Sequence, residues 1–93
     1  MIDLEEVFEK FEGEFLEFDR VENKLHERPD IHAFILLHSL APGKHRMVDW
    51  AEHDEIGLET NCDKLAAVAT EEQIRDLHRC GVRYDDGHLV MFV

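Results

Sequence analysis

Residues 82–93 read VRYDDGHLVMFV, and they contain the strongest short-range folding signal in the chain. The Asp86-Gly87 pair favours a two-residue turn, because both central positions of such a turn take a positive φ. A turn at these two residues would place Asp85 opposite His88 on the neighbouring strand. The stretch therefore predicts a C-terminal β-hairpin.

The second strand of this hairpin is apolar on both of its sides. Val90 and Phe92 would lie on one face of the hairpin. Such a strand is expected at the centre of a sheet or under a bound partner, since a strand with one solvated face normally alternates apolar and polar residues. The other face would carry Val82, Tyr84, Leu89, Met91 and Val93.

Apolar residues in the first 26 positions recur at alternating steps of three and four. This spacing predicts an amphipathic helix from about Asp3 to His26 with a narrow apolar face. Gly13 lies inside the pattern and costs about 1 kcal/mol relative to alanine, so we expect a bend there. The apolar positions are Leu4, Phe8, Phe11, Phe15, Phe18 and Leu25.

The middle of the chain predicts further helices and one more strand. Residues 29–41 are apolar around most of a helix, which predicts a central helix with His32 and His38 buried and neutral. Asn61 and a capping box from Thr70 to Gln73 mark the starts of two further helices. The predicted elements are helices at 45–53, 62–68 and 71–80 and a strand at 55–60.

These elements predict one domain, residues 1–93, of the α+β class. In this fold, N-terminal helices pack with a small three-stranded antiparallel sheet that ends in the C-terminal β-hairpin. The length supports one domain at most, because a chain of 93 residues buries enough surface for a single core.

The chain is strongly acidic, with 22 acidic residues against 10 basic ones and a formal net charge of −12. A surface of this charge disfavours direct binding to nucleic acid or to anionic lipid. No apolar stretch approaches the roughly 18 residues of a membrane span, and the acidic start lacks the positive charge of a secretory signal. We therefore expect a cytoplasmic protein that binds neither nucleic acid nor membrane directly.

His45, Asp49 and His53 are the candidate ligands for a divalent metal. Their spacing of four and four would place them on one face of the predicted helix 45–53. Imidazole and carboxylate groups suit Zn²⁺ or Ni²⁺, although the same residues would also serve as the polar face of an amphipathic helix. No other cofactor and no catalytic residue is indicated, since the common nucleotide-binding and hydrolase motifs are absent.

Cys62 is predicted to be the more reactive of the two cysteines. It follows the N-cap residue Asn61, so it would lie in the first turn of a helix, where the helix dipole lowers the pKa of a thiol. The neighbouring Asp63 would act in the opposite direction. No base or orienting residue for this thiol can be read from the sequence, so a structural role as a small apolar residue is favoured over a reactive one.

The leading functional hypothesis is a non-enzymatic protein-interaction module that works through its acidic N-terminal helix and its apolar C-terminal strand. On the predicted helix from Asp3 to His26, four acidic side chains point away from the apolar face. Small acidic domains of this kind are common among the accessory proteins of bacteriophages and prophages. The partner would be another protein or a second copy in a homodimer. The four residues are Glu5, Glu9, Glu12 and Asp19.

Two alternative functions stay open at this point. Ordered carboxylates on the N-terminal helix would imitate DNA phosphates, which lie at about one charge per 1.7 Å of the duplex axis, and would inhibit a basic nucleic-acid-binding partner. Alternatively, a metal-dependent enzyme or metal-binding protein would use His45, Asp49 and His53. Competition with DNA tests the first alternative, and metal analysis tests the second.

Overall fold

The C-terminal hairpin forms in the register that the sequence predicts. In the computed structural model, which describes residues 1–92, strands β3 (Val82–Asp85) and β4 (His88–Phe92) pair antiparallel, with Asp85 opposite His88. Asp86 and Gly87 have φ values of 47° and 86°, as a two-residue turn of this kind requires. The predicted hairpin is therefore confirmed, while Val93 lies outside the described residues.

The sheet has four antiparallel strands in the order β1-β2-β4-β3, and not the three that were predicted. The fourth strand is β1 (Val48–Glu52), which pairs with β2 (Glu55–Leu58). The predicted helix at 45–53 is therefore wrong. Backbone pairing with β2 supplies the hydrogen bonds that a short helix would have formed internally, and Val48 and Trp50 are residue types that favour strands.

The central position of β4 explains its two apolar sides. β4 lies between β2 and β3, so both of its edges are paired. Leu89 and Met91 belong to the main core, whereas Val90 lies on the opposite face and is still only 2% exposed. Of the two predicted arrangements, a strand at the centre of the sheet and a strand under a bound partner, the structure confirms the first.

The N-terminal segment is not the single bent helix that was predicted for residues 3–26. Helix α1 (Leu4–Lys10) is followed by two 3₁₀ turns, η1 (Glu12–Glu14) and η2 (Phe18–Arg20). Leu16 between them has a φ of 65°, and its N–H donates to the carbonyl oxygen of His78 at 3.3 Å. The helix breaks because this stretch bonds to the C-terminal half of the chain, which an uninterrupted helix would prevent.

The other helices form where the sequence places them. They are α2 (Pro29–Leu40), α3 (Cys62–Val68) and α4 (Glu71–Arg79). Asn61 caps α3, and the predicted capping box between Thr70 and Gln73 is present at the start of α4. On α2, however, His32 is buried and His38 is exposed, so the prediction for His38 is wrong.

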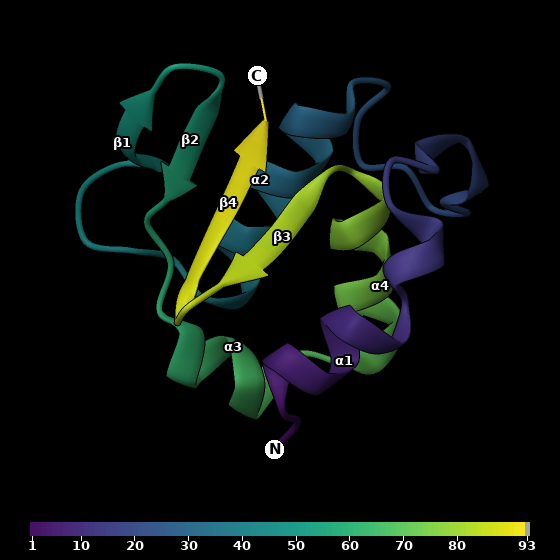
Figure 1. Cartoon of the computed structure of the whole chain (residues 1–93). Coiled ribbons are helices and arrows are strands. Elements are labelled where there is room, and N and C mark those ends of the chain that lie inside the picture. Colours follow the sequence, from purple (N-terminus) through teal and green to yellow (C-terminus); the bar gives the residue numbers. More distant parts are fainter. Residues whose placement is uncertain (93) are drawn as a thin grey trace.

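The helices and the sheet form two layers around one core. Figure 1 shows α2 behind β3 and β4, with α1, α3 and α4 around the lower and right-hand sides of the sheet. All four helices contribute to the core, together with the sheet face that carries Leu58, Val82, Leu89 and Met91. The opposite sheet face carries Trp50, Arg83, Val90 and Phe92 and has no helix in front of it in Figure 1. Within residues 1–92, no helix has the length and apolar character needed to cross a bilayer.

Candidate functional site

The predicted metal ligands do not share a helix face. His45 lies in the loop before β1, Asp49 lies at an irregular step of that strand, and His53 lies in the turn after it with a φ of 55°. Across residues 1–92, no group of three or more His, Cys, Asp or Glu side chains is arranged to hold a metal ion. The metal hypothesis assumed that these residues share one face of a helix, and that helix does not form.

The four predicted partner-binding acids are exposed, but they lie on three separate elements. Glu5 and Glu9 are one turn apart on α1, so they share a face of that helix. Glu12 is in η1 and Asp19 is in η2. The structure therefore keeps one adjacent pair of the predicted four.

Glu5 and Glu9 border a hollow between α1, α4 and β3. This hollow, which we call the α1–β3 hollow, has a volume of about 290 Å³. Its lining residues are Glu5, Phe8, Glu9, His78, Arg83 and Tyr84.

His78 brings a buried imidazole to the α1–β3 hollow. The residue is 7% exposed, and its Nδ1 lies 2.9 Å from the carbonyl oxygen of Val82. A carbonyl oxygen only accepts, so Nδ1 donates to it. Nε2 is buried and has no hydrogen-bond partner among residues 1–92. A buried polar atom without a partner costs free energy.

Two aromatic rings and a negative electrostatic field complete the α1–β3 hollow. The rings of Phe8 and Tyr84 stack with centroids 6.2 Å apart and an interplanar angle of 21°. Burial raises the pKa of the Tyr84 phenol, and neighbouring acidic groups, the Glu5 and Asp3 carboxylates among them, raise it further. The hollow thus presents aromatic carbon and carboxylate oxygen together.

Arg83 is the one basic residue in the lining, and its charge is already balanced. Its Nη2 forms an ion pair with Glu55, and its guanidinium lies 4.2 Å from the centroid of the Phe92 ring. Its Nε is buried and has no partner within the described chain. Because Glu55 neutralises Arg83, the hollow keeps a net negative rim.

An ion-pair cluster on Glu14 fixes α4, and therefore His78, against the N-terminal segment. Arg75 Nε lies 2.8 Å from Glu14 Oε1, and Arg79 bonds to the same carboxylate although Arg79 is only 4% exposed. Hydrogen bonds from Arg75, and then from Arg79, lower the pKa of Glu14. Sequence reasoning missed this cluster, because the only local signal was two arginines one turn apart on α4.

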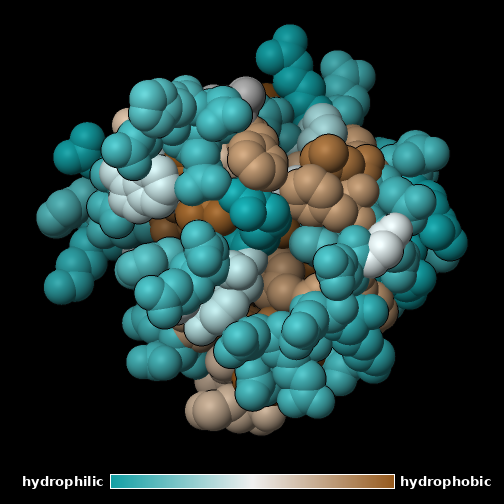
Figure 2. Space-filling model, in the orientation of Figure 1, coloured by the Kyte–Doolittle hydropathy of each residue, from teal (hydrophilic) through white to brown (hydrophobic). Residues whose placement is uncertain are grey.

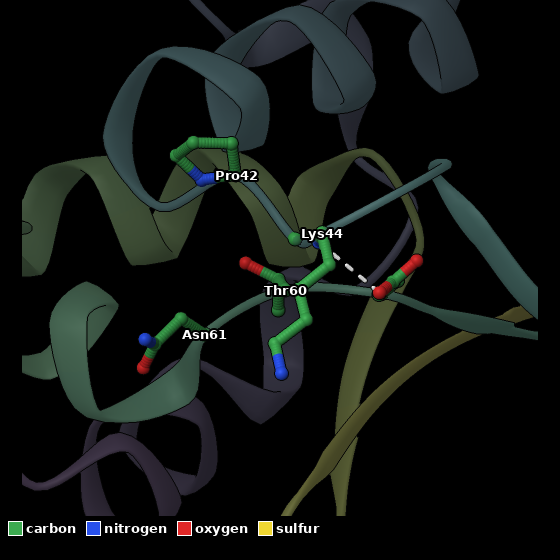
Figure 3. A pocket seen from close by; sticks show the side chains of 6 residues that line it. Pro42, Lys44, Thr60 and Asn61 are labelled. Carbon is green, nitrogen blue, oxygen red and sulfur yellow. Dashed lines mark hydrogen bonds between the residues drawn. The ribbon is translucent and has the colours of Figure 1, made fainter.

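A second hollow, of about 310 Å³, lies where the α2–β1 loop meets the end of β2. In Figure 3, Pro42, Lys44, Thr60 and Asn61 line it, and the dashed line marks the bond from the Lys44 N–H to the Glu59 carboxylate. That carboxylate also accepts from the Arg46 N–H at 3.1 Å, and these bonds lower the pKa of Glu59. The polar groups here hold the loop in place, so we assign no ligand to this hollow.

The two cysteines are poor nucleophiles in this fold. Burial raises the pKa of Cys62, and the charge of Asp63 adds to the effect, so the predicted lowering by the helix dipole is wrong. Burial raises the pKa of Cys80 to about 12. Cys62 remains the more exposed of the two thiols.

The outer sheet face carries aromatic residues within a hydrophilic surround. Trp50 is 37% exposed and Phe92 is 51% exposed. Figure 2 shows hydrophilic residues over most of this side of the molecule, with apolar residues reaching the surface near the upper ends of β3 and β4.

Comparison with protein-family models, with curated proteins and with solved structures found no match to this chain.

Proposed function

We propose that this chain is a non-enzymatic protein-interaction module that contacts a partner with a basic surface through α1 and the α1–β3 hollow. One observation carries the proposal. Glu5 and Glu9 are exposed on one helix face, border a hollow, and form no ion pair with any residue between 1 and 92. Several other acidic residues on the helices form ion pairs with arginine or lysine side chains, whereas Glu5 and Glu9 are available to a partner.

The net charge supports a basic partner in preference to a second copy of this chain. A molecule with a formal charge of −12 attracts a basic surface over a distance of about one Debye length and accelerates its association. Two copies meeting through Glu5 and Glu9 would bring like charges together, which costs free energy. We therefore favour a different protein over a homodimer through this face.

The two alternative functions have weaker support. DNA mimicry needs carboxylates ordered along one rigid surface, whereas the predicted acids lie on α1 and on two separate 3₁₀ turns. A metal function through His45, Asp49 and His53 needs these residues to converge, and their helix is replaced by a loop, a strand and a turn.

The test compares two charge-matched double variants. Glu5→Gln with Glu9→Gln removes the proposed contact, while Glu22→Gln with Glu52→Gln removes the same charge from exposed sites outside the hollow. Both variants should fold, because isolated surface changes usually alter stability by less than about 0.5 kcal/mol.

The measurement is the association rate with a purified partner that wild-type protein captures from host extract. Loss of Glu5 and Glu9 should slow association more than loss of Glu22 and Glu52, since contact acids steer a basic partner more effectively than distant ones. Equal rates for the two variants would refute this face as the contact.

A further inference from the structure

We propose that His32 acts as a pH-dependent latch on the segment 22–27. Its neutral imidazole holds this segment against α2, and protonation of the imidazole releases the segment while the core stays folded. The segment lies between η2 and α2, contains no helix or strand, and most of its residues are exposed. The release involves no residue of the α1–β3 hollow, so it does not depend on the function proposed above.

One hydrogen bond joins the segment 22–27 to the body of α2. The Leu25 N–H donates to His32 Nδ1, and the two nitrogens are 2.9 Å apart. Within residues 1–92, the segment forms no backbone-to-backbone hydrogen bond, and the Lys24 ammonium group binds carbonyl oxygens no more than five positions away. The attachment of the segment to α2 therefore depends on one imidazole nitrogen.

This hydrogen bond fixes the protonation state of His32. A backbone N–H only donates, so Nδ1 is unprotonated and the neutral ring carries its proton on Nε2. The residue is 2% exposed, its ring lies 5.6 Å from that of Phe18 between centroids, and Nε2 is buried with no partner among residues 1–92. A proton added to Nδ1 would face the Leu25 N–H, which leaves a buried positive charge without a hydrogen-bond acceptor. The charged ring therefore needs the segment to move away so that water reaches it.

The groups around His32 keep the ring neutral at pH 7. Burial lowers the pKa of His32, the Asp76 carboxylate on α4 opposes this, and the Lys24 ammonium group adds to it. The charge of Asp76 is already shared with Arg79, whose Nη1 lies 3.5 Å from Asp76 Oδ1. Once the segment opens, hydration returns the pKa toward its ordinary value of about 6.5. Opening is thus coupled to the uptake of one proton and is favoured as the pH falls below that value.

The segment 22–27 can open without unfolding the core. The Leu25 side chain is already 50% exposed, so moving the segment uncovers little apolar surface. Both flanks stay anchored, because Val21 is 2% exposed and the His32 N–H bonds to the Arg28 carbonyl in the first turn of α2. Regions with few buried contacts open at a lower free energy than the core.

The experiment measures hydrogen exchange in the full chain by NMR from about pH 7.5 to about pH 5. It compares the protection factor of the Leu25 amide with those of amides in β4. Because opening takes up one proton, protection of Leu25 should fall about tenfold for each pH unit below about 6.5 and should stay well below that of β4. A protection factor that does not change with pH would overturn the latch. Equal protection of Leu25 and β4 would also overturn it, since the segment would then open only with the whole protein.

Two histidine variants identify the group that responds to pH. In His32→Asn, the side-chain oxygen takes a position close to that of Nδ1 and cannot be protonated, so Leu25 should keep its protection at every pH. His26→Asn is the matched control and should keep the wild-type slope, because His26 Nδ1 accepts the N–H of Arg28, only two positions away. A slope that persists in His32→Asn, or disappears in His26→Asn, would assign the response to another group.

The wild-type protein provides a readout that does not depend on how the variants fold. The imidazole ¹⁵N signals of His32 at pH 7.5 should show a neutral ring with its proton on Nε2. A proton on Nδ1 at this pH would overturn the latch, because the Leu25 N–H would then have no acceptor.

Discussion

Trp50 and Gly57 form a cross-strand pair whose energetic coupling can be measured. They are opposite each other on β1 and β2, and a Cβ atom at position 57 would overlap the Trp50 indole. Glycine is required here because the ring lies directly over the backbone of β2. We expect Gly57→Ala to push the indole away from the sheet, since a side chain at a strand edge moves more easily than the backbone.

The size of the effect follows from the cover that the indole loses. Trp50 is 37% exposed, so most of its surface lies against the sheet. A tryptophan buried to this extent covers about 150 Å². At about 25 cal/mol per Å² its full burial contributes up to ~4 kcal/mol, an upper bound because the unfolded chain is not fully extended. Loss of about half of this cover should destabilise Gly57→Ala by about 2 kcal/mol.

A double-mutant cycle isolates the coupling between the two residues. In a Trp50→Ala background there is no ring to displace, and alanine in a strand is favoured over glycine by roughly 0.5–1 kcal/mol. The same Gly57→Ala change should therefore become neutral or stabilising. Urea unfolding of the four proteins, followed by far-UV circular dichroism, gives the coupling free energy.

Fluorescence provides an independent readout, because Trp50 is the only tryptophan. Gly57→Ala should shift its emission to longer wavelength in the folded protein as the indole enters water. An equal destabilisation by Gly57→Ala with and without Trp50, or an unshifted emission, would refute the packing of the indole on Gly57.

Three further predictions concern protonation and burial. Burial lowers the pKa of His32, so below about pH 6.5 the unfolded chain takes up a proton that the folded chain resists, and the urea concentration at the unfolding midpoint should be lower at pH 5.5 than at pH 7.5. A His32→Gln variant should lose this pH dependence, while the exposed-site control His38→Gln should keep it. Arginine hydrogen bonds lower the pKa of Glu14, so the stability that its carboxylate contributes is present at neutral pH and is lost as the pH falls through that lowered value. Glu14→Gln should lower the urea midpoint at pH 7 but have less effect at pH 3. An equal decrease in the midpoint at both pH values would contradict the ion-pair role. Burial raises the pKa of Cys80 to about 12, so the thiol should react with Ellman's reagent at pH 7 only as fast as the protein unfolds, and rapid reaction in the native state would disprove its burial.

Short-range signals in the sequence predicted the parts of the fold that local chemistry controls. Asp86-Gly87 defines its turn because positive φ at both positions is needed wherever the chain reverses so tightly. Asn61 and Thr70 begin α3 and α4 because their side chains accept backbone N–H groups only three residues away. These interactions involve neighbours in the sequence, so they can be predicted without knowing the rest of the fold.

The candidate site was predictable only in part. Glu5 and Glu9 were found from helical spacing, which the short α1 preserves, whereas Glu12 and Asp19 were assigned to a helix that ends at Lys10. His78 gave no signal of its own, because its place in the α1–β3 hollow depends on α1, α4 and β3 meeting. A lone histidine on a helix does not reveal which of its nitrogens will lack a partner.

The sequence by itself determined the hairpin, the caps and the three later helices, since each depends on contacts within a few residues. Only the tertiary structure decided that residues 48–52 form an edge strand and that the N-terminal pattern breaks after Lys10. In the first case, β2 supplies backbone partners from outside the segment. In the second, the His78 carbonyl and the Arg79 guanidinium bind Leu16 and Glu14 across more than 60 positions of sequence. Such long-range bonds outweigh a helical preference of a few tenths of a kcal/mol per residue, and no local pattern records them.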